Sequence, residues 1–170
     1  FSPIIETESG RVRGHVARLL AIEKNSFRRV DAKTVFTCPA DSDELVFVDR
    51  LVRTLHTLNY LTYLDRKSRG LLLLKVHPRH VASVSTDHGL AFEEILRSCG
   101  LLPAEIILEL EVLEECDSTH LLRAIANYKS RGYGISLTGS GNRVPGLMLI
   151  RDAQPTIVSF GQEASRASQS

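Results

Sequence analysis

The sequence predicts an α/β domain in which a parallel sheet is covered by helices. Short, continuous apolar runs alternate along the chain with amphipathic segments whose apolar residues recur at helical spacing. The connections between successive runs are long enough for the helical crossovers that parallel strands require. Hydrophobic periodicity does not distinguish an open, doubly wound sheet from a closed barrel, so both architectures remain at this point.

Length and composition limit the class of protein. The 170 residues, of which 43% are hydrophobic, suffice for one domain with a core. We expect neither a signal peptide nor a membrane segment, because no apolar run approaches the roughly 20 residues of a span. A net charge of +1 disfavours a binder of nucleic-acid polymers. Cys38, Cys99 and Cys116 form no paired motif, which indicates small buried thiols in a reducing cytoplasm.

The N-terminal part is predicted to contain two strands and one long helix. The segments FSPIIET and RVRGHVARLLAI flank the turn signal ESG, which predicts two joined strands. Residues 23–33, EKNSFRRVDAK, are expected to form a loop. Pro39, Asp41 and Ser42 are typical of a helix start, and this helix should end near residue 64. Its buried face is predicted from the apolar residues at helical spacing: Leu45, Val48, Val52, Leu55, Leu58, Leu61 and Leu64.

Four further strands and three helices are expected after residue 70. The strands are predicted at LLLLKV, EIILEL, YGISLT and TIVSF. The helices are predicted between them: one capped by Asp87 and ending at Gly100, one at 117–132, and a short one at 143–153. We expect the domain to span residues 1–161 and the polar residues 162–170 to form a disordered tail.

Several polar residues stand at the carboxyl ends of the predicted strands, where ligands gather in α/β proteins. They are Lys75, His77, Glu109, Glu111, Thr138 and Ser159. On a regular strand Glu109 and Glu111 point to the same side, where two carboxylates can hold a hard cation such as Mg²⁺. The alternative is that Glu111 has already left the strand and is solvated.

Other groups near these ends give weaker signals. His77 and His80 form an HPRH pair, but no further zinc ligand lies near in sequence, so we interpret them as loop histidines. Lys75 interrupts an apolar strand, so it either pairs with Glu109 or opens into a pocket that suits an anionic ligand. The loop GSGNRVPG, at 139–146, follows a strand as phosphate-binding loops do, but it matches no established glycine pattern.

The order of these elements resembles the EAL domain family, the cyclic-di-GMP phosphodiesterases of bacteria. FSPIIETESGRVRGH is similar to the family's F-x-P-I strand and G-x-x-x-G hairpin, and LLLLKVHPRHV is similar to L-x-x-N-V-x-P. GLLPAEIILELEV resembles G-L-x-P-x-x-x-x-L-E-I-T-E, IANYKSRGYGISLTGSG resembles the helix leading into G-x-x-I-A-L-D-D-F-G, and PTIVSF resembles P-D-x-I-K-I-D. The resemblance extends to about Gly161. It implies a TIM-type (β/α) barrel of the EAL type with an atypical first strand.

The family's activity depends on one or two Mg²⁺ or Mn²⁺ ions, held by carboxylates and one Asn, which activate water against a phosphodiester. Aligned residue by residue, the resemblance implies that most of these ligands are substituted here. The Glu of E-A-L falls on Val16, and the nucleotide-binding Arg falls on Leu20. The metal-binding Asn falls on Lys75. The first Glu of L-E-I-T-E is retained as Glu109, whereas the second falls on Val112.

The remaining positions also lack the residues that the family has there. The paired aspartates fall on Thr138 and Gly139, and the lysine of K-I-D falls on Ser159. Lys75 places a positive charge in the metal site, where it repels a cation and can form a structural ion pair with Glu109. We therefore expect no catalytic residue and no cofactor or metal; the weak candidates for metal ligands are Glu109 and Glu111.

The resemblance implies a catalytically degenerate domain with a regulatory role in cytoplasmic cyclic-di-GMP signalling, which binds a protein partner or the nucleotide. Leu20 favours protein interaction, and the candidate ligand contacts are Lys75, Arg79, Glu109 and Arg143. One alternative is an active phosphodiesterase that holds Mg²⁺ or Mn²⁺ at Glu109 and Glu111. The other is an unrelated α/β nucleotide-binding module.

The chain is shorter than the family's domain and begins with Phe1, so we expect it to have been trimmed from something longer. It stops near the fifth or sixth barrel strand. A barrel without its last strands exposes two sheet edges. The chain is therefore either a fragment or one that closes by pairing with a second copy as a homodimer.

Overall fold

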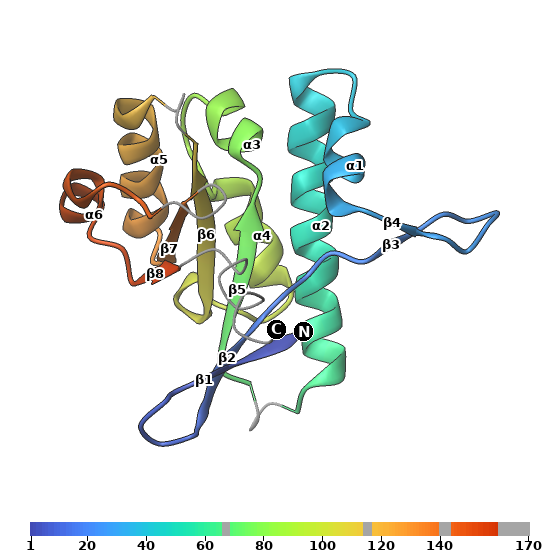
Figure 1. The fold of residues 1–170 in the computed structure, drawn as a ribbon, viewed down its shortest axis with the longest axis horizontal. Helices are drawn as coiled ribbons and strands as arrows, with labels where there is room; N and C mark the ends of the chain where they lie inside the picture. The colour runs from blue at the N-terminus through green and yellow to red at the C-terminus, as the bar shows by residue number, and fades with distance from the viewer. Residues whose placement is uncertain (66–68, 114–116, 140–143, 160–170) are drawn as a thin grey trace, which may run out of the picture.

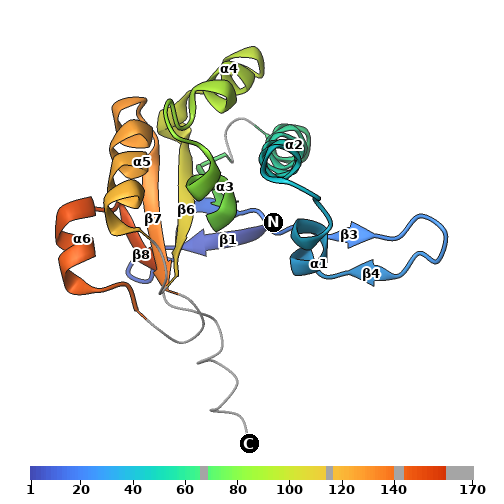
Figure 2. The same ribbon diagram turned by 90° about the horizontal axis from the view of Figure 1, so that it is seen from above.

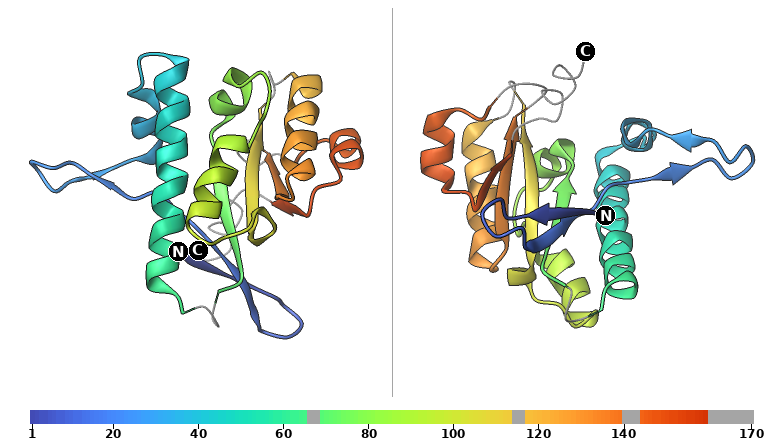
Figure 3. Two further views of the ribbon diagram at one scale, coloured as in Figure 1. Left: turned by 180° about the vertical axis from the view of Figure 1, so that it is seen from behind. Right: turned by 60° about the horizontal axis from the view of Figure 1, so that its bottom comes forward.

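The computed structural model describes residues 1–65, 69–113, 117–139 and 144–159, and its centre is one curled sheet. The strands are β1 (Ser2–Ile5), β2 (Val12–Val16), β5 (Leu71–Val76), β6 (Ile106–Val112), β7 (Gly134–Gly139) and β8 (Ile157–Ser159). They follow the order β1-β2-β5-β6-β7-β8, in which β1 is antiparallel and the others are parallel (Figure 1). The sheet curls as part of a barrel, with helices on its outer side (Figure 3). The predicted parallel α/β architecture is confirmed.

The first two strands form the predicted hairpin and join it to the parallel sheet. Gly10, in the turn, has a φ of +65°, which favours glycine. Gly14 is needed for a different reason, because a Cβ there would lie 2.1 Å from the carbonyl oxygen of Leu71. This close approach accompanies the parallel pairing of β2 with β5, in which Gly14 stands opposite Leu71. The chain thus passes from an antiparallel hairpin into a parallel sheet.

The long helix α2 (Ser42–Tyr63) has the predicted extent but buries a different face. Its start is capped by Asp41, whose carboxylate accepts the Glu44 N–H at 2.8 Å. Leu55 and Leu58, which were predicted to be inside, are 49% and 45% exposed. The buried residues are instead Leu45, Asp49, Arg53, Thr57 and Tyr60. Asp49 and Arg53 bind each other within the helix, and Asp49 also accepts the backbone N–H of His77, so these bonds satisfy the charged groups that replace the predicted apolar face.

The segment before α2 corrects the prediction of a loop. Strands β3 (Ala21–Ile22) and β4 (Arg29–Val30) pair as a β3–β4 arm that projects past α2, away from the sheet (Figures 1 and 2). Helix α1 (Ala32–Thr37) follows, and the Asp31 carboxylate caps it by accepting the Lys33 N–H at 2.8 Å. Strands of two residues are too short for an alternating pattern to reveal them.

Helices cover the outer face of the sheet and confirm the predicted crossovers. Helices α4 (Leu90–Ser98) and α5 (Ser118–Ser130) lie over the sheet, and α6 (Leu147–Ala153) lies beside α5 (Figure 2). A 3₁₀ turn, η1 (Pro103–Glu105), precedes β6. Alternate strand residues point outward into one apolar core, which includes Leu72, Leu74, Val76, Phe92, Leu96, Ile106, Leu108, Leu110, Tyr128 and Leu137. The other strand residues face the inner side of the curled sheet.

Two helix starts differ from the prediction. Helix α3 (Pro78–Ser83) begins directly after β5, where a loop was expected, because Pro78 ends the strand and also suits the first position of a helix. Helix α4 begins after Gly89, not at a cap on Asp87. Asp87 has a φ of +54° and instead accepts a bond from Arg131 at 3.3 Å. Its carboxylate therefore holds α4 near the end of α5.

The remaining expectations concern single residues and the tail. Cys38 is exposed, so its prediction as a buried thiol is wrong, because it lies at the surface end of α1. Cys99 is half-buried, and Cys116 lies outside the described residues. The predicted tail, 162–170, also lies outside them. Within the described ranges, no helix combines the length and the apolar character needed to cross a bilayer.

Candidate functional site

The carboxyl ends of β5, β6, β7 and β8 bring the predicted site residues together on the inner side of the sheet. In the strand register, Lys75 stands opposite Glu109, Glu111 opposite Thr138, and Thr138 opposite Ser159. The parallel pairing places these residues at one edge, although they are far apart in sequence. We call Lys75, Glu109 and Glu111 the strand-end cluster.

Within the strand-end cluster, the lysine pairs with a different glutamate from the one predicted. The Lys75 ammonium lies 2.8 Å from the Glu111 carboxylate, and the two side chains are 54% and 22% exposed. A lysine side chain is long enough to reach diagonally past the residue directly opposite it. The prediction of a Lys75–Glu109 pair is therefore wrong. The alternative of a solvated Glu111 beyond the strand is wrong too, because Glu111 lies within β6 and is half-buried.

The second carboxylate of the cluster, Glu109, is half-buried and has no hydrogen bond among those found in the described residues. Burial raises the pKa of Glu109 above its ordinary value, and the neighbouring Glu111 raises it further. The positive charges of Lys75 and Arg18 act in the opposite direction. The effects of the cationic and anionic neighbours on the pKa of Glu109 therefore oppose each other.

The other positions at which the resemblance places the family's ligands carry no charged side chain in this sequence. Val16 pairs with Leu73, below the level of Lys75, and Val112 pairs with Gly139. These positions offer no ligand oxygen from a side chain. The remaining polar pair, Ser136 and Ser159, is engaged: their hydroxyl oxygens are 2.9 Å apart. Among the described residues of this edge, the side chains that can act as metal ligands are therefore the two glutamates and the Thr138 hydroxyl.

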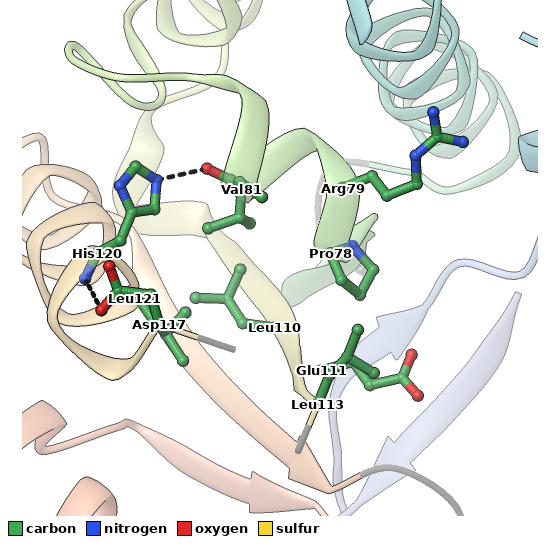
Figure 4. Close-up of a pocket in the computed structure, with 10 residues that line it drawn as sticks. Pro78, Arg79, Val81, Leu110, Glu111, Leu113, Asp117, His120 and Leu121 are labelled. Carbon is green, nitrogen blue, oxygen red and sulfur yellow. Dashed lines mark hydrogen bonds between the residues drawn. The ribbon is translucent and has the colours of Figure 1, made fainter. Parts of the chain in front are cut away.

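The predicted contacts for a nucleotide are spread over separate surfaces. Leu20 is 59% exposed and lines a cavity of about 310 Å³ with Phe1 and α2. Arg79 lies on the rim of a different cavity, and its side chain points away from Glu111 (Figure 4). Arg143 lies outside the described residues, as do the other residues of segment 140–143 in the glycine-rich loop 139–146. The structure thus brings Lys75 and Glu109 together but not Leu20 or Arg79 with them.

The cavity beside Arg79 has a volume of about 480 Å³ and lies between α3, the end of β6 and the start of α5 (Figure 4). Its walls are apolar, with Val81, Leu110, Leu113 and Leu121 among them. Glu111 lies at its edge, so the cavity adjoins the strand-end cluster. Its lining suits an apolar group better than a phosphate.

A buried charged group, which the sequence did not reveal, lies behind β5 and joins it to α2. The Asp49 carboxylate accepts two bonds from the Arg53 guanidinium, at 2.7 and 3.0 Å. Its other oxygen accepts the backbone N–H of His77 at 2.9 Å. The guanidinium also lies 4.7 Å from the ring centre of Phe92. The spacing of Asp49 and Arg53, four residues apart in one helix, was the available signal.

The two histidines of the HPRH pair have separate environments. His77 stacks on Phe36 with ring centres 4.7 Å apart, and its Nδ1 accepts the Arg79 N–H at 3.3 Å. His80 is buried in α3, so its prediction as a loop residue is wrong. Its Nδ1 lies 3.1 Å from Asp49 without the direction of a hydrogen bond. Burial lowers the pKa of His80 to about 4, so its ring is neutral at pH 7.

Metal binding has little support from the side chains that are present. A hard cation requires several anionic oxygens that are not already neutralised. The Lys75 ammonium already neutralises Glu111, and Glu109 has a raised pKa. Across the described ranges, no three His, Cys, Asp or Glu side chains are grouped so as to hold a metal ion. The described residues therefore do not fit the two-cation chemistry that the resemblance implies.

Comparison with known proteins adds information about the fold. The sequence matches no protein-family model and no curated protein. Its fold is similar to that of Bacillus subtilis YkuI, a protein with an EAL domain solved with substrate c-di-GMP and calcium: the TM-score is 0.73 at 18% identity. It is also similar to Klebsiella pneumoniae BlrP1, solved with manganese and cyclic-di-GMP, with a TM-score of 0.71 at 16% identity.

These similarities cover almost all of this chain but a smaller part of the known structures. The match to YkuI includes 99% of this chain and 42% of that chain, and the match to BlrP1 includes 97% and 40%. The curled sheet of this chain thus matches part of the barrel fold that the sequence resemblance implied. The chain has the fold of an incomplete TIM-type (β/α) barrel of the EAL type.

Proposed function

We propose that this chain is a catalytically degenerate EAL-type domain with a regulatory role in bacterial cyclic-di-GMP signalling. It acts in the cytoplasm, through interaction with a protein or by sensing the nucleotide. The fold supports this proposal, because the similar structures of YkuI and BlrP1 were solved with cyclic-di-GMP. The observation that favours a degenerate site is the 2.8 Å ion pair between Lys75 and Glu111.

The ion pair matters because of what a phosphodiester reaction requires. Metal-assisted hydrolysis needs cations that neutralise developing charge and lower the pKa of water. Here a side-chain ammonium stands at the strand ends and is bound to one of the two carboxylates. An ammonium can attract a phosphate, but it provides no coordination position for an attacking water. The same charge that opposes metal binding therefore remains compatible with binding an anion.

Protein interaction is the preferred mode of action over nucleotide sensing. The candidate contact Arg79 does not face the strand-end cluster, and neither does Leu20, where the family's nucleotide-binding Arg falls. Among the described residues, a nucleotide there would therefore meet mainly Lys75 and Arg18. Two cationic side chains, of which Lys75 is already paired with Glu111, make a weak site for a ligand that carries two phosphates. The apolar cavity next to Glu111 is instead suited to an apolar side chain from another protein.

Isothermal titration calorimetry with cyclic-di-GMP in Mg²⁺ buffer tests the proposal. We expect no release of the linear dinucleotide and either no binding or weak binding that is lost in Lys75→Ala. Lys33→Ala is the matched control, because Lys33 is an exposed lysine on α1, distant in sequence from the strand ends. Binding without hydrolysis makes the chain a nucleotide sensor, whereas absence of binding leaves protein interaction.

An active phosphodiesterase is the second candidate. The observation in its favour is that Glu109 and Glu111 lie close together on the inner side of the sheet. It requires Mg²⁺ or Mn²⁺ to displace Lys75 from Glu111. Formation of linear dinucleotide that depends on Mn²⁺ and is abolished by Glu109→Gln would replace the proposal of a degenerate site. The measurement is chromatographic separation of the nucleotides after incubation with each metal.

A further inference from the structure

The chain contains two hairpin turns of the same construction. The turn between β1 and β2 has the sequence ETESGR (6–11), and the turn of the β3–β4 arm has the sequence EKNSFR (23–28). In both turns the glutamate N–H donates to the arginine carbonyl at 2.9 Å. The glutamate carbonyl accepts the N–H of the fifth residue, at 2.8 Å in the first turn and 2.9 Å in the second. The glutamate carboxylate also accepts the serine hydroxyl in both.

The fifth position of these turns has a left-handed backbone, and the two turns fill it differently. Gly10 occupies it in the first turn with a φ of +65°, whereas Phe27 occupies it in the arm with a φ of +54°. Glycine adopts this conformation freely, but the Cβ of a phenylalanine is strained in it. Packing does not offset the strain, because Phe27 is 82% exposed. A strained aromatic residue held in water indicates a contact outside the folded chain.

Cationic side chains surround Phe27 in the sequence of the arm. Residues 24–29 include Lys24, Arg28 and Arg29 and no acidic residue, although the whole chain has a net charge of only +1. All three cationic side chains are exposed, and within the described ranges none of them forms an ion pair. The tip of the arm therefore combines one exposed aromatic ring with positive charge that is not neutralised, which suits an anionic surface.

We propose that the β3–β4 arm is a membrane-contact element, which inserts the Phe27 ring among the headgroups of an anionic lipid bilayer. The arm projects past α2 and away from the sheet, so its tip can reach a flat surface before the helices do (Figures 1 and 2). Lys24, Arg28 and Arg29 then lie beside the lipid phosphates, and the ring lies at the level of the headgroups. This inference goes beyond the proposed function and does not depend on it.

The size of the arm favours a bilayer over a pocket in another protein. The arm extends over residues 21–30. At about 3.4 Å per residue and about 5 Å between strands, each of its faces measures roughly 150 Å². A standard protein interface buries roughly 800 Å² on each partner. A bilayer needs no complementary pocket, because each cation near an anionic leaflet strengthens binding about fivefold and an aromatic ring contributes separately.

Co-sedimentation of the chain with lipid vesicles tests the proposal. We expect binding to vesicles of phosphatidylcholine mixed with phosphatidylglycerol, and much weaker binding to vesicles of phosphatidylcholine alone. Phe27→Gly should weaken the binding at least about fivefold without destabilising the fold, because Gly10 occupies the equivalent position of the first turn. Leu147→Ala is the matched control, since Leu147 is 84% exposed but lies on α6, far from the arm (Figure 2).

Two further variants test the charge and the position of the ring. Arg28→Glu should weaken binding to the anionic vesicles at least about fivefold, whereas Arg11→Glu, at the same position of the first turn, should leave it unchanged. Phe27→Trp introduces the chain's single tryptophan, whose emission should shift to shorter wavelength with anionic vesicles. The emission of Leu147→Trp should not shift.

The outcomes decide whether the arm contacts lipid. Urea denaturation establishes that each variant keeps the fold of the parent chain. A chain that does not sediment with anionic vesicles overturns the proposal, and the arm is then left to a protein partner. Binding that is unchanged in Phe27→Gly or in Arg28→Glu overturns it equally, because another surface then contacts the lipid.

Discussion

Two ion pairs of this chain have nearly the same length but different surroundings. Asp49 and Arg53 approach to 2.7 Å with side chains 1% and 2% exposed, whereas Lys75 and Glu111 approach to 2.8 Å with side chains 54% and 22% exposed. Distance alone therefore says little about what a pair does. In the buried pair, neither charge can be left without the other. In the open pair, water can replace either partner at little cost.

The two pairs are also connected through the backbone. Asp49 accepts the N–H of His77, which follows Lys75 by two residues at the end of β5. The buried pair thereby fixes where β5 ends and α3 begins, and so positions the lysine of the open pair. The buried Asp49–Arg53 pair thus supports the position of Lys75, whose ammonium is exposed enough to meet a ligand.

Removal of the Arg53 guanidinium should give the largest change in stability among the variants that test this comparison. Arg53→Met leaves the Asp49 carboxylate buried without its guanidinium, so the free energy of unfolding should fall by about 3–5 kcal/mol. Urea denaturation measures the change. Arg97→Met is the matched control, because Arg97 also pairs with an acid four residues away, Glu93, but is 73% exposed. The control should lose less than about 0.5 kcal/mol.

The double variant Asp49→Leu/Arg53→Met sharpens the result. It removes both buried charges and should be less destabilised than Arg53→Met, because the cost of the unpaired carboxylate disappears. If Arg53→Met and Arg97→Met lose equal stability, burial does not distinguish the two kinds of pair and the comparison fails.

Acid should destabilise the region around the buried Asp49–Arg53 pair, because two buried histidines lie there. Burial lowers the pKa of His80 and of His88 to about 4, and the His120 ring beside His88 acts in the same direction. A histidine whose folded pKa is below its unfolded value of about 6.5 takes up protons on unfolding. Stability should therefore fall between about pH 6.5 and pH 4, by up to about 3 kcal/mol for each histidine.

Thermal unfolding as a function of pH measures this loss. His88→Leu should flatten the profile, because neither ring nitrogen of His88 has a hydrogen-bond partner in the described structure and the ring lies between His120 and Tyr128. Glu109 contributes in the opposite direction, since burial raises its pKa and its protonation favours the folded state. An unchanged pH profile in His88→Leu would show that this histidine does not titrate on unfolding.

The smallest effect on stability is expected at the open pair. Lys75→Ala should change the free energy of unfolding by less than about 1 kcal/mol, because the ammonium is half-exposed and Glu111 regains water. It should also raise the pKa of Glu109 further, since the Lys75 charge lowers it. NMR titration of the Glu109 carboxyl group measures that pKa. A loss above about 2 kcal/mol would instead make Lys75 a structural residue.

The sequence predicted the elements whose signals are local. The apolar run at β5 and the helical segment predicted at 117–132 arise from neighbouring residues, and β5 and α5 formed where expected, whereas α4 begins after Gly89 and not at the predicted cap on Asp87. Short elements were missed, because α1, α3 and the strands of the β3–β4 arm are too brief to establish a period. The strand-end residues were predicted as a group, because parallel strands end at one edge of a sheet.

Only the tertiary structure decided which partners these residues take. Local spacing predicted a leucine face inside α2, but the inward face holds Asp49 and Arg53, which satisfy each other and the backbone of His77. The register set Lys75 opposite Glu109, but side-chain reach joined it to Glu111. A sequence specifies which groups can pair, whereas burial and distance in the folded chain determine which pairs form and which apolar face remains in water.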